Sequence, residues 1–257
     1  PVFNGWLLRV PVFLHESDAI PGLANKIMSK FATEIFVSFP VKETESFPIK
    51  KMTSVGNPIR TELFEGSTEE ATRIFGLSGE RHLILFMGGS QGATRINDLL
   101  INILPKLLVH FEIVHQCGEK NFKDVEAQSN VVVDQEVKKY YHLYPFIKEN
   151  ELKHLYKACD MIVSRAGSGS IFEIAAMGKP SILIPLPEAA QNHQLKNAYS
   201  YAKDEAALVI EEMNLTPFFF FEKLKYLFSH PEQLEKMSNA ARDFSRTGNF
   251  CRSLATC

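Results

Sequence analysis

The sequence has few of the features that secreted, membrane-spanning or nucleic-acid-binding proteins need. Its 257 residues include only four cysteines, which form no CxxC pair and no spacing typical of a metal site. No apolar run approaches the ~18 residues of a membrane span, and no stretch has the pattern of a signal peptide. The net charge of −2 leaves no excess of basic residues for a nucleic acid. These absences favour a cytoplasmic protein with reduced thiols and no nucleic-acid partner.

What is present is the composition of a globular protein, 45% hydrophobic and 23% charged, with room for one large or two smaller domains. From about residue 80 onward, short apolar runs alternate with helical periodicity, which predicts a doubly wound parallel α/β sheet. The predicted strands are 82–87, 111–116, 140–146, 161–164, 181–186 and 207–211. The predicted helices are about 94–108, 149–158, 170–177, 191–203, 217–228 and 231–244. Residues 120–136 fit this alternation poorly, and a short strand is expected at 131–133.

The first half has its own short apolar strands and a break before the second half. Strands are predicted at 11–15, 34–39 and 52–56, and the Gly-Asn-Pro-Ile-Arg segment at 56–60 precedes a charged linker. We therefore expect a domain boundary near residue 60, with domains at 1–60 and 61–257.

A glycine-rich turn, Gly88-Gly89-Ser90-Gln91-Gly92, connects the strand at 82–87 with the helix at 94–108. The order strand, glycine turn, helix directs backbone N–H groups and a positive helix end towards an anion, for which a nucleotide phosphate is the leading candidate. Ser90 can add a hydroxyl donor. The turn matches neither the Walker loop nor GxGxxG, so a tight turn that binds nothing remains open as an alternative.

A second turn of this kind, Ala166-Gly167-Ser168-Gly169-Ser170, follows the strand at 161–164 and opens the helix that contains Glu173. Ser168 and Ser170 can donate to a phosphate or cap the helix. The carboxylate of Glu173 can hold two ribose hydroxyls, as an acid does in dinucleotide-binding folds. Because Ser170 and Glu173 also have the spacing of a capping box, a local structural role for Glu173 stays open. Two such turns on one sheet favour a nucleotide more strongly than either turn alone.

Polar residues follow two further predicted strands, where open α/β sheets place their ligands. After the strand at 181–186 come Gln191, Asn192, His193 and Gln194, and then Asn197; amides suit sugar hydroxyls because each offers a donor and an acceptor. After the strand at 11–15 come Glu16 and Asp18. Without the other loops, an ordinary helix start would be the better explanation of the segment from Gln191, and for Glu16 and Asp18 helix capping is an equally good alternative.

These segments resemble one family when they are taken together. The blocks HESDAIPGLANK, GNPIR, GGSQGA, RAGSGSIFEIAAMGKPSILIPLP and QNHQLKNA occur in this order over nearly the whole chain and closely resemble the MurG family of bacterial glycosyltransferases. That family transfers N-acetylglucosamine from UDP-N-acetylglucosamine to the polyprenyl-linked lipid I, giving lipid II for peptidoglycan. The resemblance implies the GT-B fold, an α/β architecture of two Rossmann-like domains with parallel sheets and the sugar nucleotide between them.

The resemblance also implies roles for particular residues. Diphosphate contacts would come from Ser90, Gln91 and Gly92, and the backbone of Ile147 would hold the uracil. The diphosphate and ribose would lie along Ser168, Gly169, Ser170, Ile171 and Phe172, with Glu173 on the ribose hydroxyls. Gln194 and His193 would contact the N-acetylglucosamine, Asp18 the donor sugar, and Arg60 the nucleotide from the linker.

The chain departs from the family pattern in three places. Asp18 stands where Asn is common, and His193 where Gln is common. The GGTGGH-type opening loop, which would carry the candidate base, is absent. We therefore expect an N-terminally incomplete first domain that exposes apolar strand edges at 11–15 and 34–39, an unknown catalytic base, and no transfer by this chain alone.

The resemblance thus implies an inverting N-acetylglucosaminyltransferase that acts at the cytoplasmic face of the bacterial membrane as a peripheral protein. The sequence predicts no cofactor and no metal, because no DxD-like acidic pair stands at a turn. Two alternatives stay open. One is another GT-B enzyme, such as a UDP-sugar 2-epimerase or a transferase with a different acceptor. The other is a UDP-sugar-binding module without turnover.

Overall fold

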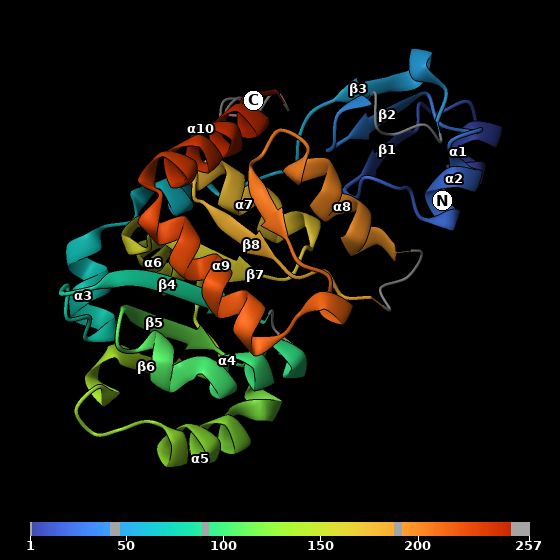
Figure 1. Ribbon diagram of the computed structural model, residues 1–257. Helices are drawn as coiled ribbons and strands as arrows, with labels where there is room; N and C mark the ends of the chain where they lie inside the picture. Colours follow the sequence, from blue (N-terminus) through green and yellow to red (C-terminus); the bar gives the residue numbers. More distant parts are fainter. Residues whose placement is uncertain (1, 42–46, 89–92, 188–191, 248–257) are drawn as a thin grey trace.

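The computed structural model describes residues 2–41, 47–88, 93–187 and 192–247, which form two parallel sheets (Figure 1). The smaller sheet has the order β1-β2-β3, with strands Phe13–Glu16, Glu34–Val37 and Met52–Ser54. The larger sheet has the order β6-β5-β4-β7-β8-β9. Its strands, from β4 to β9, are His82–Met87, Phe111–Gln116, Tyr141–Tyr144, Met161–Ser164, Ser181–Leu183 and Ala207–Val209. All pairings among these strands are parallel, so the predicted α/β class is confirmed.

Helices cover both faces of the larger sheet, whereas α1 and α2 pack on the smaller sheet through Val2 and Met28. From α1 to α10 the α-helices are Val2–Leu7, Leu23–Met28, Thr68–Phe75, Thr94–Leu107, Phe122–Val132, Glu149–Ala158, Ser168–Met177, His193–Ala202, Pro217–Ser229 and Pro231–Thr247. Successive side chains of a strand point to opposite faces. Leu83, Leu85 and Met87 of β4 accordingly join the core under α3, α6 and α7, whereas Ile84 and Phe86 join the core under α4 and α9.

The order of the larger sheet creates a switch point beside its central strand. From β4 the chain builds outwards through β5 and β6 on one side, and then through β7, β8 and β9 on the other. The connections after β4 and β7 therefore diverge to opposite faces, which leaves a crevice at the carboxyl ends of these two strands. Both predicted glycine-rich turns follow these strands, so the topology brings the two turns to one place.

The smaller sheet has its own core, formed by Leu14, Ala32, Ile35, Val37 and Phe47. The expectation of an exposed edge at 34–39 is wrong, because β2 pairs with β1 on one side and with β3 on the other. Phe39 leaves this sheet and is fully buried against the rings of Phe172 and Phe244. The smaller sheet is thereby anchored to α7 and α10.

The strand expected at 131–133 is also wrong, because residues 122–132 form helix α5. Only Val125 and Ser129 of this helix are buried, whereas Val131 is 85% exposed. Three consecutive valines suggested a strand through their β-branched side chains, but the spacing of the two buried residues is that of a helix.

Two other sequence-based expectations concern membranes and thiols. In the described part of the chain, no helix is both long and apolar enough to cross a membrane. Cys117 and Cys159 are free and buried, and burial raises the pKa of the Cys159 thiol to about 12. Cys251 and Cys257 lie outside the described residues.

Candidate functional site

The Glu173 carboxylate stands at the centre of the candidate site and joins three parts of the chain. Its Oε2 accepts a hydrogen bond from the hydroxyl of Tyr156 on α6 at 2.9 Å. Its Oε1 accepts one from Arg60, in the segment between the two sheets, at 3.1 Å. Arg60 also pairs with Glu149 at the start of α6. The structure thus brings Arg60 and Glu173 together, as the sequence analysis expected of a shared site.

The capping-box alternative for Glu173 does not agree with this geometry. Helix α7 begins at Ser168 with Gly167 as its N-cap, and no side chain in the described part of the chain caps it. Ser170 is therefore a residue of the first turn and cannot serve as the capping residue of a box with Glu173. Because both oxygens of Glu173 are bonded to side chains from other elements, the carboxylate has a tertiary role.

The start of α7 presents an open backbone. In an α-helix the first N–H groups have no acceptor within the helix, and here these belong to Ser168, Gly169 and Ser170. A Cβ atom added at Gly167 or Gly169 would meet no atom of the described residues within 4 Å, so none of these residues fills the space beside either glycine. This turn can therefore receive an anion on its backbone N–H groups, with the helix dipole favouring negative charge.

Ile171 and Phe172 do not point their side chains towards this space. Both are buried in the core beneath α7, at 0% and 1% exposure. Phe172 packs against Phe39 and Phe244 there. Any contact of these two residues with a nucleotide would therefore have to use the backbone.

The first glycine-rich turn includes Ser90, Gln91 and Gly92, which lie outside the described residues. The residues around this turn are held in place by hydrogen bonds. Gly88 donates its N–H to the carbonyl of Gln116 at 3.3 Å. Behind the turn, the His115 ring lies between the Asn97 amide and the Tyr141 hydroxyl, with distances of 3.0 and 2.9 Å. Burial lowers the pKa of His115 to about 3, so this ring is neutral and fixes the start of α4 against β5.

Ile147, predicted to hold the base through its backbone, already uses one of its two backbone groups. Its N–H donates to the side-chain oxygen of Gln116 at 3.0 Å. Gln116 stands at the carboxyl end of β5 and is 5% exposed. The carbonyl of Ile147 therefore remains the main candidate for binding a base.

Asp18 and His193 meet where the segment after β1 touches the start of α8, and Gln194 follows His193 in this helix. His193 Nδ1 lies 3.4 Å from a carboxylate oxygen of Asp18. The side-chain oxygen of Gln194 accepts hydrogen bonds from the backbone N–H groups of Ala166 and Leu186. Gln194 thus holds the second glycine-rich turn, and its amide nitrogen has no hydrogen-bond partner among the described residues.

Asn197 has a role that the sequence analysis missed. Its side chain is fully buried; it accepts from the N–H of Ala19 at 2.8 Å and donates to Asp18 at 2.7 Å and to the carbonyl of Ala166 at 3.4 Å. Asn197 follows His193 by four residues, so both lie on one helix face. This four-residue spacing could have indicated from the sequence that Asn197 faces the same site as His193. Tyr156 and Gln116, the other two missed residues, carry no such signal.

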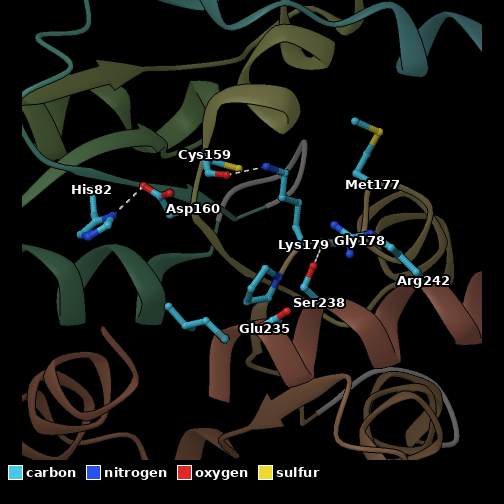
Figure 2. A pocket seen from close by; sticks show the side chains of 11 residues that line it. His82, Cys159, Asp160, Met177, Gly178, Lys179, Glu235, Ser238 and Arg242 are labelled. Carbon is cyan, nitrogen blue, oxygen red and sulfur yellow. Dashed lines mark hydrogen bonds and ion pairs between the residues drawn. The ribbon is translucent and has the colours of Figure 1, made fainter. Parts of the chain in front are cut away.

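The pocket in Figure 2 lies away from this site, at the amino-terminal ends of β4 and β7. It has a volume of about 280 Å³ and includes none of the predicted site residues. Within it, the Lys179 ammonium donates to the carbonyls of Lys157 and Cys159, which end helix α6. Such a contact stabilises a helix C-terminus, and this accounts for Lys179 without a ligand.

Family models match both parts of the chain. Residues 83–250 match the glycosyltransferase family 28 C-terminal domain, and residues 1–37 match the N-terminal domain of the same family. The chain belongs to glycosyltransferase family 28. The family 28 match includes both glycine-rich turns, Glu173 and the start of α8.

Curated relatives show which group within family 28 this chain resembles. A Clostridium tetani protein named UDP-N-acetylglucosamine–N-acetylmuramyl-(pentapeptide) pyrophosphoryl-undecaprenol N-acetylglucosamine transferase is 38% identical over 93% of this chain and 64% of its own length. A relative of the same name, numbered 2, from Bacillus thuringiensis subsp. konkukian is 38% identical over 99% of this chain and 68% of its own length. The resemblance to the MurG family is therefore confirmed, and the chain spans about two thirds of these relatives.

Solved structures agree with this assignment. MurG of Acinetobacter baumannii superimposes with a TM-score of 0.74 at 27% identity, covering 94% of this chain and 65% of that one. The UDP-GlcNAc 2-epimerase of Neisseria meningitidis, solved with bound UDP-GlcNAc, superimposes with a TM-score of 0.68 at 16% identity, covering 96% and 69%. The second likeness is one of fold alone. The GT-B architecture expected from the sequence is confirmed.

Proposed function

We propose that this chain belongs to an inverting glycosyltransferase that moves N-acetylglucosamine from UDP-N-acetylglucosamine to lipid I, forming lipid II. One observation carries the proposal: the Glu173 carboxylate and the open start of α7 stand together at the switch point of a family 28 domain. We place the domain boundary near residue 60, because residues before it build the smaller sheet and Leu63 after it joins the core of the larger one.

The nucleotide would lie across the carboxyl ends of β4, β5 and β7. The diphosphate binds at the N–H groups of residues 168–170 and at the turn containing Ser90, Gln91 and Gly92. The ribose hydroxyls bind Glu173, and the uracil binds the backbone at Ile147. The amide nitrogen of Gln194, with His193 and Asp18 nearby, faces the donor sugar.

In the reaction, an acceptor hydroxyl attacks the anomeric carbon of the donor while UDP departs with the bond electrons. The negative charge that grows on the diphosphate is stabilised by N–H groups already oriented at the start of α7, so no reorganisation is needed at that moment. The same groups would hold the diphosphate without a metal. The residue that removes the acceptor's proton is not assigned.

The acceptor's polyprenyl chain places the reaction at a membrane, and we propose a peripheral position at its cytoplasmic face. The exposed apolar side chains of Phe3, Trp6 and Leu7 on α1 support contact with such a surface.

The function is tested with labelled UDP-N-acetylglucosamine and a lipid I analogue. The assay compares the 257-residue chain with a chimera in which the opening segment of the Clostridium tetani relative precedes Pro1. We expect both to bind UDP and only the chimera to form the lipid II analogue. UDP binding by the chimera without transfer would favour a binding module, and an epimerised donor would favour a 2-epimerase. If the 257-residue chain formed product at nearly the chimera's rate, the expectation that the opening segment supplies part of the active site would be wrong.

Glu173→Ala tests the central residue. Loss of its bonds to the ribose should weaken UDP binding by about 1.5–3 kcal/mol. The matched control is Glu149→Ala, because Glu149 also pairs with Arg60 but is largely exposed and lies outside the proposed ribose contacts. Calorimetric titration with UDP measures both variants. Equal UDP affinities of Glu173→Ala and Glu149→Ala would show that Glu173 does not bind the nucleotide.

A further inference from the structure

The two partners of Glu173 differ in kind. Tyr156 is 1% exposed, and its ring lies in the core cluster that also contains Leu155 and Phe172. The side chain of Arg60 is 42% exposed and is shared with Glu149. A ribose diol approaching from solvent can replace the exposed guanidinium at Oε1, but it cannot replace a hydroxyl that reaches Oε2 from inside the protein.

The Tyr156 hydroxyl is a permanent donor in this position. Burial, the nearby charge of Glu173 and the hydrogen bond between them raise the pKa of Tyr156 well above its usual value. The phenol therefore keeps its proton and donates it to Oε2. Each carboxylate oxygen has two lone pairs, so Oε2 can accept from Tyr156 and from one ribose hydroxyl at the same time.

The orientation of the carboxylate decides whether it can bind both hydroxyls of a diol. A glutamate side chain has three rotatable bonds, and 22% of the Glu173 side chain is exposed. Without a fixed partner the carboxylate could rotate, and its orientation would then have to be restored each time a nucleotide binds. The bond from α6 removes this freedom in advance, which is the advantage of a preorganised site.

We propose that Tyr156 is a positioning residue that fixes the Glu173 carboxylate for bidentate recognition of the ribose 2′- and 3′-hydroxyls, and so sets the preference for ribonucleotides. The inference rests on the proposed nucleotide-sugar site and adds to it the residue that orients the ribose contact. Tyr156 itself touches no nucleotide atom in this account and acts through Glu173.

The test uses Tyr156→Phe, which removes the hydroxyl and keeps the buried ring. Dissociation constants are measured for UDP, 2′-deoxy-UDP and 3′-deoxy-UDP. For the variant we expect UDP binding to weaken by about tenfold, the order expected for a lost hydrogen bond to a charged group, while both deoxy analogues weaken less. The ratio of deoxy to ribo dissociation constants should therefore fall towards one. General loosening of the site would weaken all three ligands alike.

Two further variants complete the experiment. Tyr201→Phe is the matched control, because Tyr201 is equally buried and its hydroxyl does not bond Glu173; the ratio should stay at the wild-type value. Tyr156→Met also removes the hydroxyl, and its flexible apolar side chain adapts to the buried space; it should lower the ratio as Tyr156→Phe does. This second variant decides the matter if Tyr156→Phe does not fold, as judged from its melting temperature.

The outcomes separate the inference from the function on which it rests. Wild-type protein that binds no UDP would overturn both. The positioning role alone would be overturned if the wild type prefers UDP to its deoxy analogues and Tyr156→Phe, or Tyr156→Met where Tyr156→Phe does not fold, keeps the same preference. A ratio that falls in the Tyr156 variants but not in Tyr201→Phe supports it.

Discussion

Replacing Asn197 by alanine should weaken the connection between the smaller sheet and the rest of the protein. The Asn197 side chain is fully buried and bonds to Ala19 and Asp18 after β1 and to Ala166 after β7. Alanine would leave these three groups without their partner at a place where few waters can enter.

The size of the effect follows from the three bonds. The bond to the Asp18 carboxylate, at 2.7 Å, belongs to the class that contributes about 1.5–3 kcal/mol. Leaving the Ala19 N–H unsatisfied costs about 1–3 kcal/mol more, whereas the 3.4 Å bond to Ala166 adds little. Asp18 is partly exposed, so water will offset some of its loss. We expect the docking of the smaller sheet to weaken by about 2–4 kcal/mol.

Native-state hydrogen exchange measures this directly, because it reports local opening in a chain whose two parts need not unfold together. In Asn197→Ala, the Ala19 amide should lose protection while amides within β4 and β5 keep theirs. The control is Asn102→Ala, which removes an exposed amide that bonds to the carbonyl of Asp98 within α4. A loss below about 1 kcal/mol at Ala19, with protection equal to that in the control, would refute the reasoning.

Three further changes test the packing and the base site. Phe39→Ala should destabilise the docked smaller sheet by about 3–5 kcal/mol, whereas Phe13→Ala, at an exposed ring, should cost less than about 1 kcal/mol; thermal melts compare the two. His115 has a pKa of about 3 in the fold, below its ordinary 6.5. At pH values between 3 and 6.5 only the unfolded chain binds this proton, so the free energy of unfolding falls as the pH falls. From pH 7 to pH 5 the free energy of unfolding of the wild type should therefore fall by roughly 2 kcal/mol more than that of His115→Gln, as measured by urea unfolding. Gln116→Leu leaves the Ile147 N–H unpaired and should weaken UDP about tenfold without changing pyrophosphate affinity, both measured by calorimetry. Equal losses of stability in Phe39→Ala and Phe13→Ala would contradict the packing argument. Parallel pH curves for the wild type and His115→Gln would contradict the lowered pKa of His115, and unchanged UDP binding by Gln116→Leu would contradict the role of Gln116 at the base site.

The strand, turn and helix pattern could be predicted because its causes are local. Apolar runs such as 82–87 and the glycines that follow them specify a buried strand and its turn within a few residues. The same locality explains the error at 131–133, where the valines indicated a strand although the helix is decided by packing of Val125 and Ser129. The spacing of Ser170 and Glu173 likewise allowed a local cap that the structure does not use.

The resemblance assigned Arg60 and Glu173 to one nucleotide site, but the direct bonds between residues of the site could not be predicted, because the bonded residues are widely separated in the sequence. Arg60 lies 113 residues from Glu173, and Ala19 lies 178 from Asn197. Nothing in the residues around Tyr156 distinguishes a phenol that bonds a site carboxylate from one that fills a core. Only the topology, which brings α6 and α7 together, assigns that hydroxyl its partner.

The separation between Ala19 and Asn197 has a consequence for the protein while the ribosome is making it. Chains grow at roughly 5–20 residues per second, so on the order of ten to forty seconds pass between the appearance of these two residues. During that interval the bonds from α8 cannot form, and Phe39 has neither Phe172 nor Phe244 to cover it. The segment that contains Phe39 therefore exposes an aromatic side chain during synthesis that the finished fold buries.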